Sequence, residues 1–412
     1  MTTAGTATTL IFAVTILLYP LVAVFSPKAM VALLVLPVLI SLFIGRNRQA
    51  VFGALPRVVL TLLAVLAAWS LVTIWWSPRP LGGLTLWLRV VGIGLCGMVM
   101  FATAAKAAVL NATAADRRLL VTAFVASGWI FVALFAFELI TEGNLSRLAV
   151  SLWNLLTPWD TGPPRASLLL LQASAALAVF AWPCMLAIRR RNSTTVAALF
   201  GLAVGAVLLT QNMQASVIAF ACGIAVYAVV YKYRRWGIAA FLAGLAVVNL
   251  GLVLAAFEFV AAEQRDGVSI TLSGSTRERL YIIDFVYDKI IQHPLIGWGF
   301  DASRAIGQDT QGLSSSNPSI PLHPHNLWAQ TWLELGLVGL VLMISLVVSI
   351  SMRLAAGGRG RATVAAAAAT VATYLLIGNI SYGMWQNWWL VIAWLNAGFL
   401  AVMAVADGGA DP

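Results

Sequence analysis

Apolar stretches of about twenty residues recur along most of the chain, and they constrain its fold more than any other feature. A helix needs roughly 20 such residues to cross the hydrocarbon core of a bilayer. Hydrophobic residues make up 61% of the 412 residues and charged residues only 10%, whereas soluble domains are about half apolar and a quarter charged. This composition excludes a soluble enzyme, a disordered chain, a collagen and a disulfide scaffold. It predicts an all-α polytopic membrane protein.

We expect about twelve membrane-spanning helices from the apolar runs. Two long uncharged stretches are split at the polar dips 210–214 and 379–387. The first run lacks Lys and Arg over residues 1–20, so we interpret it as a membrane helix and not as a cleaved signal peptide. The expected spans are 8–25, 29–44, 57–76, 84–103, 119–140, 166–188, 194–210, 214–231, 236–260, 326–352, 362–380 and 387–406.

The basic residues predict how these spans are oriented. An even number of spans places both termini on one side of the membrane. The loops on that side would carry fifteen Lys and Arg, whereas the short loops opposite carry two, Lys28 and Arg79. Because positive charge gathers on cytoplasmic loops, both termini are predicted to be cytoplasmic. The same rule accounts for the net charge of +10 without a nucleic-acid partner.

Two outer segments exceed ordinary connectors, 141–165 and above all 261–325. The second holds all three histidines and seven of the fifteen acidic residues. The chain is therefore divided into nine spans (1–260), a large outer loop (261–325), and three spans with a short tail (326–412). Side chains able to do acid–base chemistry concentrate in the loop and at its borders.

The loop contains its own helical pattern. Ser275 to Glu278 fits a capping box, and apolar residues at helical spacing follow as far as Ile291. An amphipathic helix is predicted, lying on the membrane surface or on the bundle, ended by His293-Pro294 and followed by a turn at 297–299. Another helix is expected to begin at His325-Asn326 and to carry Glu334 into the membrane. Its Gly336 and Gly339 would let a neighbouring helix approach.

Two motifs in this region resemble the bacterial O-antigen ligase family. His325-Asn326, followed after nine residues by Gly336-Leu337-Val338-Gly339, is similar to the family's His-Asn…Gly-x-x-Gly signature. Upstream, Arg277 with Tyr281, and then His293-Pro294-Leu295-Ile296-Gly297-Trp298-Gly299, resemble an Arg…Trp…His-Pro-Leu-x-Gly-x-Gly pattern. Tyr281 replaces the commoner tryptophan, and Asn212 to Ser216 lack an arginine that many relatives carry.

The resemblance implies a GT-C-like membrane glycosyltransferase of the bacterial inner membrane. Such ligases transfer O-antigen polysaccharide from undecaprenyl diphosphate to the lipid A–core at the periplasmic face. They are described as inverting and independent of metal, so no cofactor is expected. An essential histidine and diphosphate-binding arginines are also implied. Protein partners and the oligomeric state stay open.

The candidate site residues follow from this chemistry. His325 suits a base and Glu334 is either a second base or an ion-pair partner that orients His325 or an arginine. Arginines suit a diphosphate, and supporting residues would stand nearby. The diphosphate candidates are Arg277, Arg89, Arg165 and Arg279, and the supporting residues are Asn326, Tyr281 and Gln214.

Each candidate has a plainer alternative. His325 could be a polar helix cap or a donor-binding group, and Arg277 a solvated residue at a helix start. Arg89 could pair with Glu334 or Glu138, or reach the interface. An O-antigen polymerase and a protein oligosaccharyltransferase use the same donor and stay open as functions. A lipid or polysaccharide transporter is the rival from another class, although the ionisable groups gather on one face as an enzyme would need.

Overall fold

The computed structural model describes the chain except residues 1–2, 45–55, 111–112, 157–165, 211–213, 267–273, 307–322, 357 and 406–412. Across the described residues the regular structure is helical and contains no strand, which confirms the predicted all-α class. The helices are α1 (Thr3–Phe25), α2 (Met30–Ile44), α3 (Arg57–Thr73), α4 (Pro80–Leu110), α5 (Ala114–Ile140), α6 (Asn144–Leu156), α7 (Ala166–Arg191), α8 (Thr194–Thr210), α9 (Gln214–Tyr233), α10 (Arg235–Asp266), α11 (Gly274–Gln292), α12 (Ser303–Ile306), α13 (Leu327–Ala356), α14 (Arg361–Ile380) and α15 (Asn387–Val405).

Each expected span coincides with one of these helices. In the described part of the chain, nine helices are long and apolar enough to cross a membrane, and α2, α8 and α15 belong to three shorter apolar segments. A multi-pass membrane protein is therefore confirmed. The number of crossings and the side of each terminus stay predictions.

The centre of the bundle is built from α7, α14 and α15, and it is held by aromatic and small side chains. Tyr19 of α1 stacks on Phe180 of α7 with ring centroids 4.3 Å apart. Trp182 donates a hydrogen bond from Nε1 to Thr373 Oγ1, 2.9 Å away, which ties α7 to α14. Small residues let α14 approach α9 closely, because a Cβ on Gly223 would lie 2.5 Å from Thr373 Oγ1.

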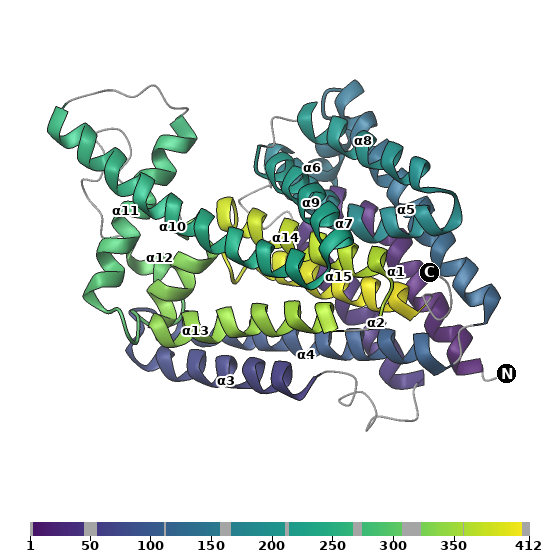
Figure 1. The fold of residues 1–412 in the computed structure, drawn as a ribbon, viewed down its shortest axis with the longest axis horizontal. Coiled ribbons are helices and arrows are strands. Elements are labelled where there is room, and N and C mark those ends of the chain that lie inside the picture. Colours follow the sequence, from purple (N-terminus) through teal and green to yellow (C-terminus); the bar gives the residue numbers. More distant parts are fainter. Residues whose placement is uncertain are drawn as a thin grey trace.

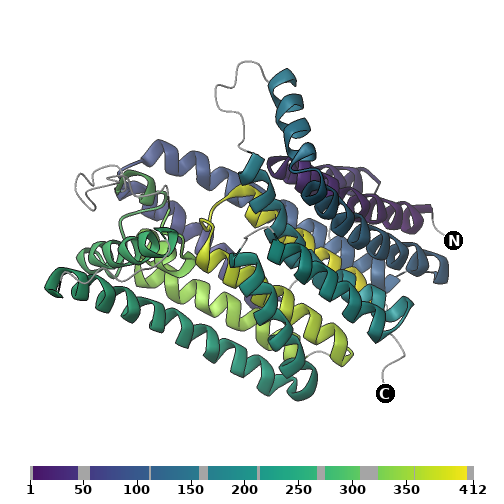
Figure 2. The same ribbon diagram turned by 90° about the horizontal axis from the view of Figure 1, so that it is seen from above.

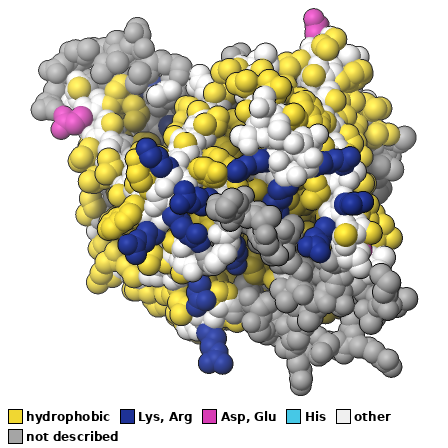
Figure 3. All heavy atoms as spheres, turned by 45° about the vertical axis from the view of Figure 1, so that its right-hand side comes forward, with side chains coloured by type: hydrophobic (Ala, Val, Ile, Leu, Met, Phe, Trp, Pro, Cys, Tyr) yellow, Lys and Arg dark blue, Asp and Glu magenta, His cyan; other side chains and the backbone are white. Residues whose placement is uncertain are grey.

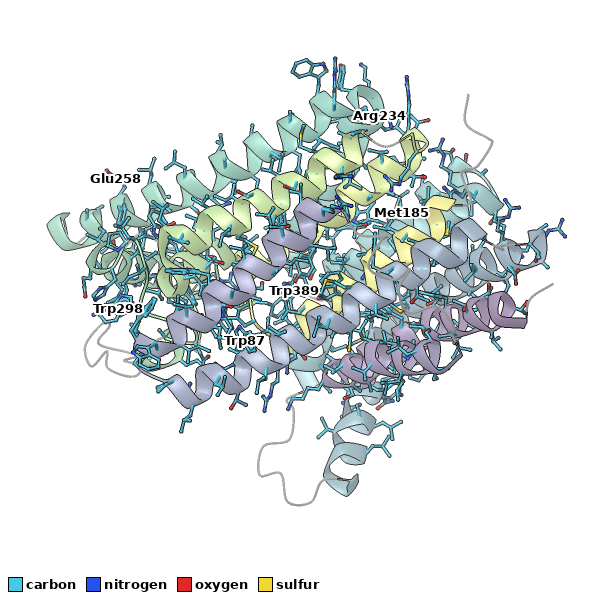
Figure 4. All side chains as sticks on the ribbon, turned by 90° about the horizontal axis from the view of Figure 1, so that it is seen from below. Trp87, Met185, Arg234, Glu258, Trp298 and Trp389 are labelled. Carbon is cyan, nitrogen blue, oxygen red and sulfur yellow. The ribbon has the colours of Figure 1, made fainter. Side chains whose placement is uncertain are left out.

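One end of the bundle is rich in basic side chains. The start of α1 and the end of α15 lie at the same end of the bundle (Figure 1). Lys and Arg gather on this end when it is turned toward the viewer (Figure 3). Arg189, Arg190 and Arg191 finish α7 there, Arg353 lies in the last turn of α13, and Arg361 begins α14. Figure 4 places Arg234 at this end and Glu258 and Trp298 toward the other.

The predicted amphipathic helix is α11, and it packs on the bundle (Figures 1 and 2). Ile282, Val286 and Ile290 are buried with Ala329 and Leu333 of α13. α11 begins at Gly274 and ends at Gln292, in agreement with the breaking effect expected of His293-Pro294. The Ser275 side chain of the expected capping box lies outside the described residues.

The other outer segment contains α6, which a buried carboxylate holds in place. Glu138 near the end of α5 accepts hydrogen bonds from the backbone N–H of Leu145, at 2.8 Å, and of Ser146, at 3.1 Å. These N–H groups lie in the first turn of α6, where they have no partner within the helix. Glu138 therefore serves as a cap for α6 and not as a partner of Arg89.

The helix predicted from His325 begins later and is interrupted. α13 starts at Leu327, and Asn326 Oδ1 accepts a hydrogen bond from Ala329 N at 2.9 Å, as an N-cap residue does. His325 precedes the helix, with a φ of 53°. Within α13, Gly336 has φ 67° and ψ −172°, which breaks the helix in two.

Gly336 does permit a close approach, but by a loop and not by the expected helix. A Cβ at this position would lie 2.2 Å from the Leu295 carbonyl oxygen and 2.6 Å from the Gly297 nitrogen. Both are backbone atoms, so neither can move aside as a flexible side chain would. A positive φ also disfavours any residue with a Cβ.

Gly336→Ala is expected to lower the free energy of unfolding by more than about 2 kcal/mol, because strain in the backbone adds to the clash. The thermal midpoint in detergent micelles measures the loss. Gly94→Ala in α4 is the control, because nothing lies within 4 Å of a Cβ there. Equal midpoints for the two variants would contradict the role given to Gly336.

Candidate functional site

The loop 293–300 completes the hydrogen bonding of the broken helix. Trp298 N donates to Leu333 O at 2.8 Å and Gly299 N to Glu334 O at 2.9 Å, while Leu337 N donates to Pro294 O at 2.9 Å. A helix that breaks leaves carbonyl and N–H groups without partners. The His-Pro-Leu-Ile-Gly-Trp-Gly motif therefore supplies the partners that the interrupted helix lacks.

The first half of the chain braces the same loop. Trp76 Nε1 donates to Gly297 O at 3.1 Å, and Ser77 Oγ donates to Phe300 O at 2.8 Å. Trp69 Nε1 reaches Leu335 O on α13 itself, at 2.8 Å. The α3–α4 connection thus fixes the loop, and α3 itself contacts the helix break.

Glu334 lies fully buried at the centre of this arrangement. Its Oε1 accepts from Ser303 Oγ at 2.6 Å and Gln330 Nε2 at 3.0 Å. Its Oε2 accepts from Asp301 N at 3.0 Å and Trp385 Nε1 at 2.8 Å. All four partners donate, so both oxygens act as acceptors. These bonds join α13 to the segment 301–303 and to the α14–α15 connection.

The connection between α14 and α15, residues 381–386, forms a wall of the site beside α13. Met384 N donates to Gln330 Oε1 at 2.7 Å, and Trp385 reaches Glu334. Gln386 Nε2 lies 3.2 Å from His323 Nε2, and its Oε1 accepts from Trp388 Nε1 at 3.0 Å. The sequence indicates only a polar dip between two spans here, yet this connection contributes several polar contacts.

His325 is held in one orientation by this wall. Its Nδ1 lies 2.9 Å from the backbone carbonyl of Ser381. A carbonyl only accepts, so Nδ1 carries the proton and the neutral ring keeps its lone pair on Nε2. Burial lowers the pKa of His325, as does the positive charge of Arg279, while the Ser381 carbonyl and Glu278 oppose the shift. Neutral His325 therefore presents Nε2 as a proton acceptor.

His323 lies against His325 with ring centroids 4.4 Å apart. Burial, His325 and Arg304 together lower the pKa of His323 to about 3. His323 is thus uncharged at neutral pH, and it adds no second positive charge beside His325.

The predicted arginines occupy different places. Arg279 is half-buried and close enough to His325 to affect its pKa. Arg277 is exposed, and its guanidinium carbon lies 6.0 Å from the centre of the Tyr281 ring. Both belong to α11, as the motif predicted. Of these two arginines, Arg279 is the one among the charges that shift the pKa of His325, whereas the motif favours Arg277.

Other predicted residues are not gathered at the histidine. Arg89 is exposed on α4, and within the described residues it forms no ion pair with Glu334 or Glu138, whose oxygens are bound by other donors. Gln214 is exposed at the start of α9. Arg165 lies outside the described residues. Asn326, predicted as a supporting residue, caps α13, and the cap position that was an alternative for His325 is thus filled by its neighbour.

The hydrogen bonds of Glu334 favour a positioning role over a role as a base. Among the described residues its partners are neutral donors, so it forms no ion pair with an arginine and does not touch His325. Full burial also leaves no part of the Glu334 side chain exposed at the surface. We therefore assign Glu334 a positioning role.

Several site residues escaped the sequence reasoning. Asp301 follows the motif loop with a φ of 66° and is buried. Its carboxylate lies 3.1 Å from Arg304 Nε and 3.7 Å from Arg79 Nη1. Burial raises the pKa of Asp301 against the opposing effect of these two arginines. The available signal was the polar spacing of Asp301, Ser303 and Arg304 directly after the glycine motif. No group of His, Cys, Asp and Glu in the described part of the chain is arranged to hold a metal ion.

Comparison with known proteins agrees with the motifs. Residues 196–344 match the family described as O-Antigen ligase. This segment is therefore similar to the O-antigen ligase family. The matched segment contains the histidine, the α11 arginines and the helix break, whereas the α3–α4 and α14–α15 connections lie outside it.

Curated relatives of the domain come from Rickettsia species and carry the name "Putative polysaccharide ligase". The chain is 36% identical to that of Rickettsia conorii over 120 residues, 28% of this chain and 29% of the relative. It is 36% identical to that of Rickettsia bellii over 125 residues, 29% of this chain and 30% of the relative. The chain thus matches less than a third of the length of these relatives.

Glu334→Gln should lower the free energy of unfolding by about 2 kcal/mol or more, because an amide nitrogen replaces an acceptor that two buried donors require. Thermal or denaturant unfolding in detergent micelles would show the loss. Glu258→Gln provides the control, since Glu258 is an exposed carboxylate on α10 (Figure 4). An unchanged unfolding midpoint for Glu334→Gln would exclude the positioning role.

Proposed function

We propose that this protein is an O-antigen ligase that transfers a polysaccharide from undecaprenyl diphosphate to the lipid A–core. The observation that carries the proposal is His325, held by the Ser381 carbonyl with its Nε2 lone pair available and with Arg279 nearby. The ligase-family match and the relatives named for polysaccharide ligation support the same activity.

The geometry fits a direct displacement. A hydroxyl of the acceptor sugar attacks the anomeric carbon of the donor, and the bond from that carbon to the diphosphate oxygen breaks. The hydroxyl proton passes to His325 Nε2 as the new glycosidic bond forms. The diphosphate leaves with its electron pair, and attack from the opposite side inverts the anomeric centre.

Arginines stabilise the leaving group in this mechanism. Guanidinium groups stay charged and can bind two phosphate oxygens at once, so they offset the charge that develops on the diphosphate. We assign this task to Arg277 and Arg279 on α11. Arg89 and Arg165 stay predicted diphosphate ligands, while Tyr281 supports Arg277 through its ring and Gln214 stays a predicted accessory residue.

The proposed setting is the bacterial inner membrane, with both termini in the cytoplasm and the site facing the periplasm. The arginine-rich helix ends support this orientation, because they lie opposite the loop 293–306 (Figures 1 and 3). The site then meets two lipid-anchored substrates on the outer side.

The test is complementation of a strain that lacks its own ligase, with wild type or His325→Ala. Lipopolysaccharide is separated on a gel, and polymer still attached to its carrier lipid is detected beside it. Wild type should restore the ladder on lipid A–core. His325→Ala should abolish it while carrier-linked polymer accumulates, because the proton acceptor is gone.

His293→Ala is the matched control, since His293 packs on Trp298 and is given no role in proton transfer. A normal ladder with His325→Ala would refute the base. Accumulation of single repeats in place of carrier-linked polymer would identify a polymerase and contradict ligation.

The pH profile gives a second test. The reaction requires neutral His325, whose pKa lies below its ordinary value of 6.5, so kcat should fall only as the pH drops below that value. Arg279→Gln removes a positive charge that disfavours the imidazolium ion, so the pKa rises. We expect the acidic limb of the kcat profile to move to higher pH.

Arg277→Gln serves as the control for this shift, because Arg277 is exposed and is not among the charges identified as shifting the pKa of His325. It should weaken donor binding without moving the limb. If the acidic limb of the kcat profile lies at the same pH in wild type and in Arg279→Gln, then either His325 is not the titrating group or Arg279 is not its neighbour.

A further inference from the structure

Two arginines from distant parts of the chain meet on one buried carboxylate. The Asp301 side chain is 4% exposed, whereas those of Arg304 and Arg79 are 43% and 39% exposed. The carboxylate therefore faces inward and the two guanidinium groups face outward. Two positive charges on one negative charge leave a net positive charge at the surface of the site.

The backbone under both arginines is fixed before any ligand binds. Asp301 N donates to Glu334 Oε2 at 3.0 Å, which anchors the segment that leads to Arg304. Ser77 Oγ donates to Phe300 O at 2.8 Å and accepts from Arg79 N at 3.2 Å. One hydroxyl thus joins the backbones that carry the two arginines.

α4 packs tightly against this pair. A Cβ on Gly82 would lie 3.2 Å from Asp301 Oδ2 and 3.5 Å from Arg79 Nη2. The first turn of α4 thus borders the carboxylate and helps to fix it. Such rigid support is more than an exposed surface ion pair needs, since these contribute about 0–1 kcal/mol to stability.

One member of the pair, Arg304, also acts on the histidines. The charge of Arg304 lowers the pKa of His323, whose ring lies 4.4 Å from that of His325. Arg279 acts on His325 itself. The histidine pair is therefore influenced by two positive charges, that of Arg279 on α11 and that of Arg304 beside Asp301.

We propose that Arg79 and Arg304, held by Asp301, form a second anion site that binds a phosphate group of a lipid-linked substrate next to His325. Arg304 contacts Asp301 through Nε, and the described residues offer no other partner to its terminal amines. The Arg79 pair, at 3.7 Å, is longer than a hydrogen bond, so its N–H groups stay available for a ligand. A phosphate accepts several such bonds at once.

This inference rests on the proposed function for the identity of its substrate. Transfer between two lipid-anchored molecules requires that both reacting sugars be held beside the base. The donor carries a diphosphate, and the lipid A–core acceptor also carries phosphate groups. Both sources share the chemistry that the pair recognises, and the experiment separates them.

The experiment measures binding to the intact protein in detergent micelles. Farnesyl diphosphate stands for the donor, bisphosphorylated lipid A for the acceptor, and phosphatidylglycerol for an ordinary anionic lipid. Arg304→Gln and Arg79→Gln should each raise the Kd for one phosphate probe about tenfold, the loss of one charge-assisted contact. Arg304→Lys, which keeps the charge without the planar fork, should weaken binding less.

Arg359→Gln is the matched control, because it removes one exposed charge from the connection between α13 and α14. It should leave the Kd of both phosphate probes unchanged. The thermal midpoint of each variant verifies folding. If Arg304→Gln fails to fold, Arg304→Lys decides.

If the arginine variants lose affinity for farnesyl diphosphate alone, the site binds the donor. If they lose affinity for lipid A alone, the site binds the acceptor. Either result supports the proposal. Unchanged binding in folded variants, or an equal loss for phosphatidylglycerol, overturns it. If the arginine variants bind the phosphate probes more weakly but the wild-type protein does not ligate, the anion site stands and the proposed function is refuted. If the wild-type protein ligates but the variants bind the probes as wild type does, the proposed function stands and the anion site is refuted.

Discussion

The site depends on the interruption of α13 at Gly336. A continuous helix satisfies its own backbone and has nothing to offer a neighbouring loop inside a membrane. The break frees carbonyl and N–H groups of residues 333–338, and the loop 293–300 binds them. Backbone at membrane depth can be irregular only where protein surrounds it, and Trp69 and Trp76 of the α3–α4 region complete that enclosure.

Glu334 converts this local break into a junction of distant segments. A carboxylate in an apolar bundle is costly unless several donors surround it. Here the donors come from 301–303, from α13 itself and from the α14–α15 connection. Because the carboxylate needs all of these segments in place, its burial stabilises only the arrangement in which the wall carrying Ser381 stands beside His325.

The sequence was informative wherever the signal was local. Span positions, the amphipathic α11 and the end of α11 at His293-Pro294 follow from periodicity and helix-breaking residues, and the structure confirms them. The start of α13 was misplaced because His325 adopts a left-handed conformation that precedes the Asn326 cap. Pairings across the chain could not be predicted: no spacing shows that Arg79 meets Asp301, or that Trp385 meets Glu334. Arg89 drew attention because it is charged within a span; it is exposed and forms no ion pair with Glu334 or Glu138 in the described residues, and its role in ligand binding stays a prediction.

The group that orients His325 is a backbone carbonyl, and this has a genetic consequence. Any residue at position 381 that tolerates the local backbone supplies the same acceptor, so the tautomer of the histidine survives substitutions of the Ser381 side chain. Selection at that position can then act on the shape of the connection instead of the identity of one amino acid. Relatives could differ freely at position 381 while keeping an identical proton acceptor, and replacing side chains one at a time would not detect the atom that holds the histidine in place.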